Sequence, residues 1–318
     1  MKILVIGDTG FVGSAICNRL LSSGVQVIGL SRSSFVGSAY MHVAVDRNDI
    51  GNVRSVLDKF QPGIVIDAAA MTLNSTLPLL PMLNERAIRY VLLSSSDVYR
   101  NYGHLQNLEV SETLTEALSE DSPLRTRRYP YRAEQPRSPD APDYWMDDYD
   151  KIPIEEAVIQ ILDNWTILRL PMVYGVGDRQ RRFRWAVRPM SVGKAQLTVP
   201  IKWANWVTTY SYVENVAAAI VHTAKLAKAG RQIFNIADHA AVSHFTWLER
   251  IAAIVGWSGE IRLADDPKTD LYKAAARLNL DAHLRISTKK IESMLKFSAP
   301  VTWESALEET ILYLSRIE

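Results

Sequence analysis

The chain has 318 residues, of which 47% are hydrophobic, and its formal net charge is +1 at pH 7. A chain of this length buries a large core, and its near-zero charge gives no overall electrostatic case for binding nucleic acid or a membrane. The single cysteine, Cys17, excludes an internal disulfide framework. The apolar start at residues 3–6 is too short for a signal peptide, so we expect a cytoplasmic protein.

A glycine triplet lies between the first predicted strand and the first predicted helix. Gly7, Gly10 and Gly13 follow the apolar run at residues 3–6, and residues 14–22 repeat apolar residues at helical spacing. In a dinucleotide-binding turn the first glycine permits the bend, the second admits the pyrophosphate, and the third allows close helix packing. The spacing therefore predicts a dinucleotide site, with an ordinary glycine turn as the alternative.

The end of the second predicted strand favours NADP over NAD. Residues 25–30 are followed by Ser31, Arg32 and Ser33, at the place where an NAD-selective domain usually carries an acidic residue for the ribose 2′-hydroxyl. A guanidinium and hydroxyl groups suit a 2′-phosphate instead. The alternative is a solvated loop arginine.

The rest of the chain alternates strand and helix patterns. Strand candidates recur at residues 41–45, 63–66, 90–94, 165–170 and 232–236, which predicts an α/β fold with a Rossmann-type, doubly wound parallel sheet. Residues 101–144 lack periodicity and indicate a long excursion or lid. We expect a dinucleotide-binding domain of residues 1–174 plus about 209–238. A smaller, mainly helical substrate lobe would hold residues 175–208 and 239–318.

Seven segments together resemble the extended short-chain dehydrogenase/reductase family, the NAD(P)-dependent sugar epimerases, dehydratases and carbonyl reductases. They are GDTGFVG at 7–13, VDRND at 45–49, IDAAA at 66–70, LLSSSDVY at 92–99, LRLPMVYGVGD at 168–178, YSYVENVAAAI at 210–220 and FNIAD at 234–238. The resemblance implies an oxidoreductase or an epimerase/dehydratase-like enzyme. Such an enzyme moves a hydride at a carbonyl or alcohol carbon, here of a small sugar-like or anionic substrate.

The resemblance also implies roles for single residues. Asp46 and Arg47 would lie near the adenine, and Pro171 and Val173 by the nicotinamide. Ser95 matches the family's active-site hydroxyl, with Ser96 as the fallback and a capped strand end as the alternative. The expected cofactor-binding residues are Gly7, Thr9, Gly10, Phe11, Val12, Gly13, Ser31, Arg32, Ser33, Asp46, Arg47, Ala68, Ala69, Ala70, Lys151, Pro171 and Val173.

The sequence departs from the family at its acid/base pair, a tyrosine followed four residues later by a lysine. Lys151 takes the lysine position because Glu155 and Glu156 follow it, and Asp147 then stands at the tyrosine position. A carboxylate beside an ammonium cannot supply a proton near neutrality, although it could act as a base. An exposed ion pair between Asp147 and Lys151 is at least as strong an expectation.

Tyr149 is two residues from Lys151, about 200° around a helix, so in a regular helix the two face apart. A displaced tyrosine, different chemistry and cofactor binding without turnover all stay open. The candidate catalytic residues are Ser95, Lys151, Tyr149 and Asp147.

Partners are specified less well. Residues 71–89 contain Pro78 and Pro81, so the crossover helix that the family uses in dimers must be short, and a homodimer is an open option. Two arginine clusters suit an anionic substrate or form a salt-bridged surface, and they make nucleic acid a weak third option. The six histidines lack ligand spacing, so we predict no metal site. The first arginine cluster is Arg125, Arg127, Arg128 and Arg132, and the second is Arg179, Arg181, Arg182 and Arg184.

The second functional hypothesis is a non-catalytic NADP(H)-binding regulator or interaction protein.

Overall fold

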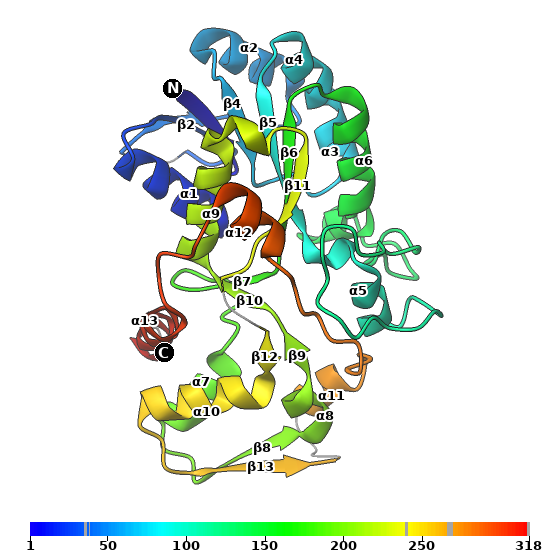
Figure 1. Cartoon of the computed structure of the whole chain (residues 1–318), viewed down its shortest axis with the longest axis vertical. Coiled ribbons are helices and arrows are strands. Elements are labelled where there is room, and N and C mark those ends of the chain that lie inside the picture. Colours follow the sequence, from blue (N-terminus) through cyan, green and yellow to red (C-terminus); the bar gives the residue numbers. More distant parts are fainter. Residues whose placement is uncertain (35–36, 38, 239–240, 266–269, 317–318) are drawn as a thin grey trace.

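A seven-stranded sheet forms the frame of the computed structural model, which describes residues 1–34, 37, 39–238, 241–265 and 270–316 (Figure 1). Its order is β11-β6-β5-β4-β1-β2-β3, and all of its strand pairs are parallel. The predicted Rossmann-type fold is therefore confirmed. The strands are β1 (Lys2–Ile6), β2 (Gln26–Ser31), β3 (Met41–Ala44), β4 (Ile64–Asp67), β5 (Arg89–Ser95), β6 (Trp165–Leu170) and β11 (Gln232–Asn235).

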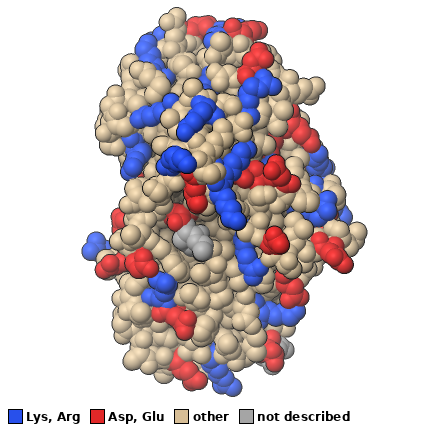
Figure 2. Space-filling model, viewed as in Figure 1, with Lys and Arg blue, Asp and Glu red and all other residues tan. Residues whose placement is uncertain are grey.

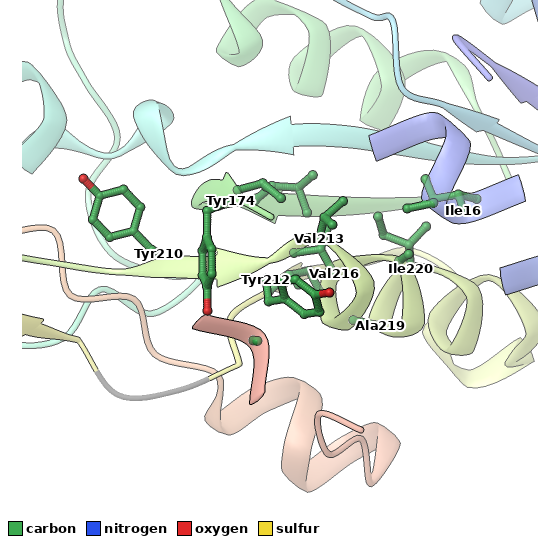
Figure 3. Close-up of a cluster of buried hydrophobic side chains, with 14 of the residues drawn as sticks. Ile16, Tyr174, Tyr210, Tyr212, Val213, Val216, Ala219 and Ile220 are labelled. Atoms are coloured by element: carbon green, nitrogen blue, oxygen red, sulfur yellow. The ribbon is translucent and has the colours of Figure 1, made fainter. Parts of the chain in front are cut away.

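Helices cover both faces of this sheet, as the apolar runs of its strands require. Ile3 and Val5 of β1 face α1 (Phe11–Ser22) and α9 (Val213–Lys225), whereas Leu4 and Ile6 face α2 (Ile50–Phe60). Figure 3 shows the first of these cores, where Ile16 of α1 lies near Ile220 of α9. Helix α6 (Lys151–Ile161) packs on the α2 side.

The crossover between β4 and β5 is short, as its prolines predict. It consists of α3 (Leu73–Thr76), the 3-10 turn η1 (Leu77–Leu79) and α4 (Leu80–Glu85). Pro78 and Pro81 stand at the starts of η1 and α4, where the missing N–H costs nothing.

A second lobe lies beyond the carboxyl ends of the strands (Figure 1). It joins short strand pairs to the predicted helices, and Trp203 and Trp206 pack there against His244 rather than lining an open wall. The pair of β7 (Met172–Tyr174) and β10 (Tyr210–Tyr212) connects the lobe to the sheet. The lobe contains α7 (Arg184–Ser191), β8 (Gln196–Pro200), α8 (Ile201–Asn205), β9 (Val207–Thr208), β12 (Val242–Ser243), α10 (His244–Val255), β13 (Glu260–Ala264) and α11 (Asp270–Ala275). Beyond it come α12 (Lys289–Leu295) and α13 (Trp303–Arg316), which pack against β11 and against α7 and α10, respectively.

The excursion after β5 folds back onto the molecule. It contains the 3-10 turn η2 (Ser96–Val98), α5 (Arg100–Leu105) and the 3-10 turn η3 (Tyr144–Asp147). Leu118 pairs with Ile286 in an isolated bridge and is buried in a separate apolar cluster. The excursion is thus anchored at several points between its two ends.

Basic and acidic side chains are interspersed over the face shown in Figure 2. Within the described ranges, no helix has both the length and the apolar character needed to cross a bilayer.

Candidate active site

The glycine turn has the geometry that a dinucleotide pyrophosphate requires. Gly7 adopts a φ of +85°, and its N–H donates to the Leu30 carbonyl at 2.8 Å. A Cβ at Gly13 would overlap the Gly7 carbonyl oxygen, and one at Gly10 would lie 3.1 Å from it. Gly10 is the N-cap of α1 and makes no side-chain cap, so the helix presents its first N–H groups at a bare turn. The residues present therefore fit a nicotinamide dinucleotide.

The groove beside this turn is formed by small residues after β4. A Cβ at Gly7 would lie 3.1 Å from the Ala69 Cβ and 3.4 Å from the Ala68 carbonyl carbon. Both alanines are half-buried, and Ala70 is buried. Three of the expected cofactor residues thus lie at the carboxyl end of β4, against the glycine turn.

The end of β2 lies at the same edge of the sheet. Thr9 donates its hydroxyl to Ser31 Oγ at 3.1 Å, which ties the glycine turn to β2. Arg32 and Ser33 follow and are exposed. The geometry therefore leaves the Arg32 guanidinium accessible to a ligand at this edge.

Arg47 has a structural task that the sequence did not predict. Its guanidinium donates to both carboxylate oxygens of Asp67, at 2.9 and 2.8 Å, and to the Ser75 carbonyl. Asp46 is exposed and accepts from the Asn48 N–H at 2.9 Å. The Arg47 side chain is thus held in the core by an ion pair with Asp67. The predicted position near the adenine stays a prediction, but the guanidinium charge is already neutralised by Asp67.

Three serines end β5, and only Ser95 is half-exposed. Ser94 is buried and donates to Glu155 Oε1 at 2.5 Å, where Glu155 also pairs with Arg169. Ser96 is buried as well. Ser95 Oγ accepts from the Asp97 N–H at 3.2 Å, which orients the hydroxyl at the strand end.

Lys151 is the first residue of α6 and reaches across the ends of two strands. Its Nζ donates to the carbonyls of Ala70 at 2.5 Å and Leu93 at 3.1 Å. Burial lowers the pKa of Lys151 to about 8, against the opposing charge of Asp97. The ammonium therefore sits between β4 and β5 at the expected cofactor groove.

Tyr149 lies beside Lys151, contrary to the prediction that the two face apart. That prediction assumed a helix through both residues, but α6 begins at Lys151, and Asp150 is its extended N-cap. The Tyr149 ring centre is 5.6 Å from Lys151 Nζ, and Ser95 lies near enough to the phenol to lower its pKa, against the larger effects of burial and of Asp97. The irregular helix start therefore brings a displaced tyrosine to Ser95 and Lys151.

Asp150 causes this helix start. Its carboxylate accepts from the Ile152 N–H at 3.1 Å, from the Arg125 guanidinium at 2.9 Å and from the Tyr129 N–H at 2.8 Å. The side chains of Arg125 and Asp150 are both fully buried. Tyr149 itself is pinned by an isolated bridge to Thr72. Long-range contacts thus decide which tyrosine reaches the site.

Asp147 does not take the tyrosine's place. It lies in η3, where its carboxylate accepts from the N–H groups of Ala133 at 3.1 Å and Arg137 at 2.7 Å and pairs with the Arg137 guanidinium. These backbone hydrogen bonds hold the pKa of Asp147 below its usual value. Both expectations for Asp147, a catalytic base and an ion pair with Lys151, are wrong because the residue precedes the helix.

Asp97 is the functional candidate that sequence reasoning missed. Tyr149 donates its hydroxyl to Asp97 Oδ2 at 2.7 Å, and the second carboxylate oxygen is buried without a partner in the described chain. Burial raises the pKa of Asp97, although the charge of Arg125 opposes the shift. The one available signal was its place in the LLSSSDVY segment, two residues after Ser95.

The Tyr149 phenol is held in its protonated form. Burial raises its pKa well above the usual value, and the charge of Asp97 raises it further. Tyr131, from the excursion, packs at a tilt against Tyr149 with ring centres 5.2 Å apart and shares a 2.6 Å hydrogen bond with Tyr102. No sequence pattern marked these two tyrosines.

The two arginine clusters lie in different surroundings. In the first cluster Arg125 pairs with Asp150, Arg128 with Glu156 and Arg132 with Asp148. The second lies around an open pocket of about 670 Å³ in the segment after β7, and its Arg182 pairs with Asp178 at 2.9 Å. That segment approaches the glycine turn, since a Cβ at Gly177 would lie 3.8 Å from Phe11. The cavity is lined by Arg179, Gln180, Arg181, Arg182, Arg184, Trp185, Arg188 and Pro189.

Comparisons with known proteins agree with this geometry. The family described as "NAD dependent epimerase/dehydratase family" matches residues 3–237. The spore coat polysaccharide biosynthesis protein SpsK of Bacillus subtilis is 25% identical over 81% of this chain and 80% of its own length. The chloroplast stem-loop binding protein of 41 kDa b of Arabidopsis thaliana is 24% identical over 92% of this chain and 74% of its own.

Among solved structures, dTDP-glucose 4,6-dehydratase of Bacillus anthracis in complex with NAD superposes with a TM-score of 0.71. The match covers 99% of this chain and 97% of the dehydratase chain at 18% sequence identity, and this likeness shows the fold. The fold and the glycine turn define a nicotinamide-dinucleotide-binding protein of the extended short-chain dehydrogenase/reductase type. The chain belongs to the NAD-dependent epimerase/dehydratase family.

Proposed function

We propose that this protein is an NADP-dependent enzyme that transfers a hydride at a carbonyl or alcohol carbon of a sugar-like, anionic substrate. The transfer is either a net oxidoreduction or one step of an epimerase or dehydratase cycle. The observation that carries the proposal is the meeting of Ser95, Tyr149 and Lys151 at the ends of β4 and β5.

Each of the three residues has a role that follows from its environment. The Ser95 and Tyr149 hydroxyls hold the substrate oxygen at the reacting carbon. The raised pKa keeps the Tyr149 phenol protonated. Its one proton, which is directed at Asp97 in the structure, would turn to that oxygen as negative charge develops there. Lys151 holds the cofactor ribose with its ammonium. The cofactor supplies or accepts the hydride when bound.

NADP is the proposed cofactor because of the exposed residues after β2. Arg32 offers a guanidinium, and Ser31 and Ser33 offer hydroxyls, to a 2′-phosphate. The exposed position of Arg32 fits both a contact with the 2′-phosphate and a solvated loop arginine. The affinities for NADPH and NADH therefore test it directly.

An anionic, sugar-like substrate is proposed from the cavity after β7. Five of its lining residues are arginines, which suit phosphate or carboxylate groups, and Trp185 offers a flat apolar face. The relatives named for polysaccharide biosynthesis and for a dTDP-sugar dehydratase support a sugar nucleotide. We propose no nucleic-acid or membrane partner.

The alternative is a protein that binds the cofactor but catalyses no reaction. This alternative was suggested by an aspartate at the tyrosine position, and the placement of Tyr149 near Ser95 supports the enzyme instead. Turnover separates the two hypotheses.

The first experiment supplies the protein with NADP⁺ or NADPH and a panel that includes UDP-glucose and dTDP-glucose. Reduced cofactor is followed by fluorescence and the sugar by NMR. We expect turnover by the native chain and a loss of about 100-fold or more in Tyr149→Phe, because the proton donor is gone.

Tyr144→Phe is the matched control, since Tyr144 is an exposed tyrosine just before the site and its loss should leave the rate unchanged. Equal rates in Tyr149→Phe and the native chain would refute the role of Tyr149. Cofactor binding with no change in any sugar of the panel would favour the non-catalytic alternative.

A further inference from the structure

We propose that His42 is a positioning residue for the 2′ end of the cofactor: as an imidazolium paired with Asp8, it fixes the turn that carries Arg32 and Ser33. The inference rests on the proposed use of NADP. It concerns a buried ion pair that the glycine spacing does not require.

Two hydrogen-bond contacts of His42 link three parts of the chain. From β3, its Nδ1 lies 2.7 Å from Asp8 Oδ2 and its Nε2 lies 2.8 Å from the Ser33 carbonyl. The side chains of His42 and Asp8 are 6% and 0% exposed. One imidazole thus connects the glycine turn to the end of β2.

Both ring nitrogens face acceptors. A carbonyl oxygen cannot donate, and an ionised carboxylate cannot donate either. A neutral imidazole carries one N–H and would leave one of these two short contacts without a proton. A doubly protonated ring satisfies both contacts.

The surroundings favour an ion pair at this place. Tyr40 also donates its hydroxyl to Asp8 Oδ2, at 3.1 Å, which adds a hydrogen bond to the carboxylate. The nearby Cys17 thiol is kept neutral, since burial raises its pKa to about 12. The pair has no net charge, so its burial costs less than that of either ion alone.

The chain makes room for this pair. A Cβ at Gly29, in the middle of β2, would overlap the Asp8 carboxylate. Gly29 therefore lets the Asp8 side chain lie flat against β2, beneath the segment that continues to Ser31. Neither Gly29 nor Asp8 is explained by the glycine triplet itself.

The position of the pair decides which cofactor it affects. Thr9 holds β2 from the glycine turn, and His42 of β3 contacts both Asp8 and the Ser33 carbonyl. Arg32, between these fixed points, would contact a 2′-phosphate, which NADPH has and NADH lacks. Loosening the turn should therefore weaken NADPH binding and leave NADH binding nearly unchanged.

The test measures dissociation constants of NADPH and NADH by tryptophan fluorescence in the full chain. We expect the native protein to prefer NADPH and Arg32→Ala to lose most of the preference. His42→Ala should lower the preference by about tenfold through NADPH alone. His222→Ala is the matched control, because His222 also contacts a backbone carbonyl, that of Leu295, far from β2 in the sequence.

The isosteric Asp8→Asn keeps the shape and removes the charge, so it should act like His42→Ala. In addition, ¹⁵N NMR of the native chain at about pH 8, where a free imidazole is mostly neutral, should show protons on both His42 nitrogens. An unchanged preference in both variants, or one unprotonated nitrogen, overturns the inference while the proposed enzyme stands. Binding of neither cofactor, or equal affinity for both by the native chain, refutes the proposed NADP dependence itself.

Discussion

The phenol of Tyr149 and the ammonium of Lys151 are tuned by burial in opposite senses. Burial and Asp97 raise the pKa of Tyr149, whereas burial lowers that of Lys151 to about 8. A protonated phenol can donate, which is the role proposed for Tyr149 toward a substrate oxygen. In the reverse direction the phenol's own proton can pass to Asp97, 2.7 Å away. Sequence named Ser95 and Lys151 as candidates, and the structure places them at the ends of β4 and β5, but sequence could not show that Asp97 is turned toward Tyr149.

The pKa of Lys151 predicts how cofactor binding depends on pH. The ammonium is present below pH 8 and is lost as the pH rises through about 8. Affinity for NADPH should therefore fall by up to about tenfold between pH 7 and 9 if the charged form binds. Isothermal titration calorimetry of the native chain and of Lys151→Met checks this. The variant should bind weakly and with little pH dependence, and a flat native profile would contradict the role of the ammonium.

At the scale of the element, the start of α6 determines the site. The glutamates after Lys151 gave the register that named it as the lysine candidate. Sequence could not show where the helix starts, because the partner of the N-cap residue is Arg125, 25 positions earlier. Asp150 therefore has two tasks: it caps α6, and it neutralises a buried guanidinium.

Replacing this cap should cost more than replacing an ordinary one. Asp150→Ala removes the hydrogen bond to Ile152 and leaves Arg125 buried without its partner, so we expect a loss of about 3–5 kcal/mol in unfolding free energy. Asp49→Ala is the control, since Asp49 caps α2 at the surface and its loss should cost about 1 kcal/mol. Urea unfolding of both variants gives the comparison. Equal losses would mean that the pair with Arg125 contributes little.

At the scale of the whole molecule, the sheet was predictable from sequence, whereas the contacts that hold the excursion against the rest of the chain were not. Buried parallel strands are continuous apolar runs, so residues such as Ile3 and Val91 mark them without reference to the rest of the chain. The excursion is held by contacts distant in sequence, such as the bridge between Leu118 and Ile286. Local patterns carry no information about such contacts. The cofactor turn, which is local, was therefore predicted, whereas the tyrosine that completes the site was left open.

The most direct test of the central claim is a crystal structure of the full chain with NADPH bound. We predict that the Tyr149 hydroxyl lies within hydrogen-bond distance of Ser95 and faces the nicotinamide ring, with the Lys151 ammonium on the adjoining ribose. A nicotinamide that lies away from Ser95 and Tyr149, or beside another proton donor, would contradict the claim that Tyr149 is the displaced acid of this site.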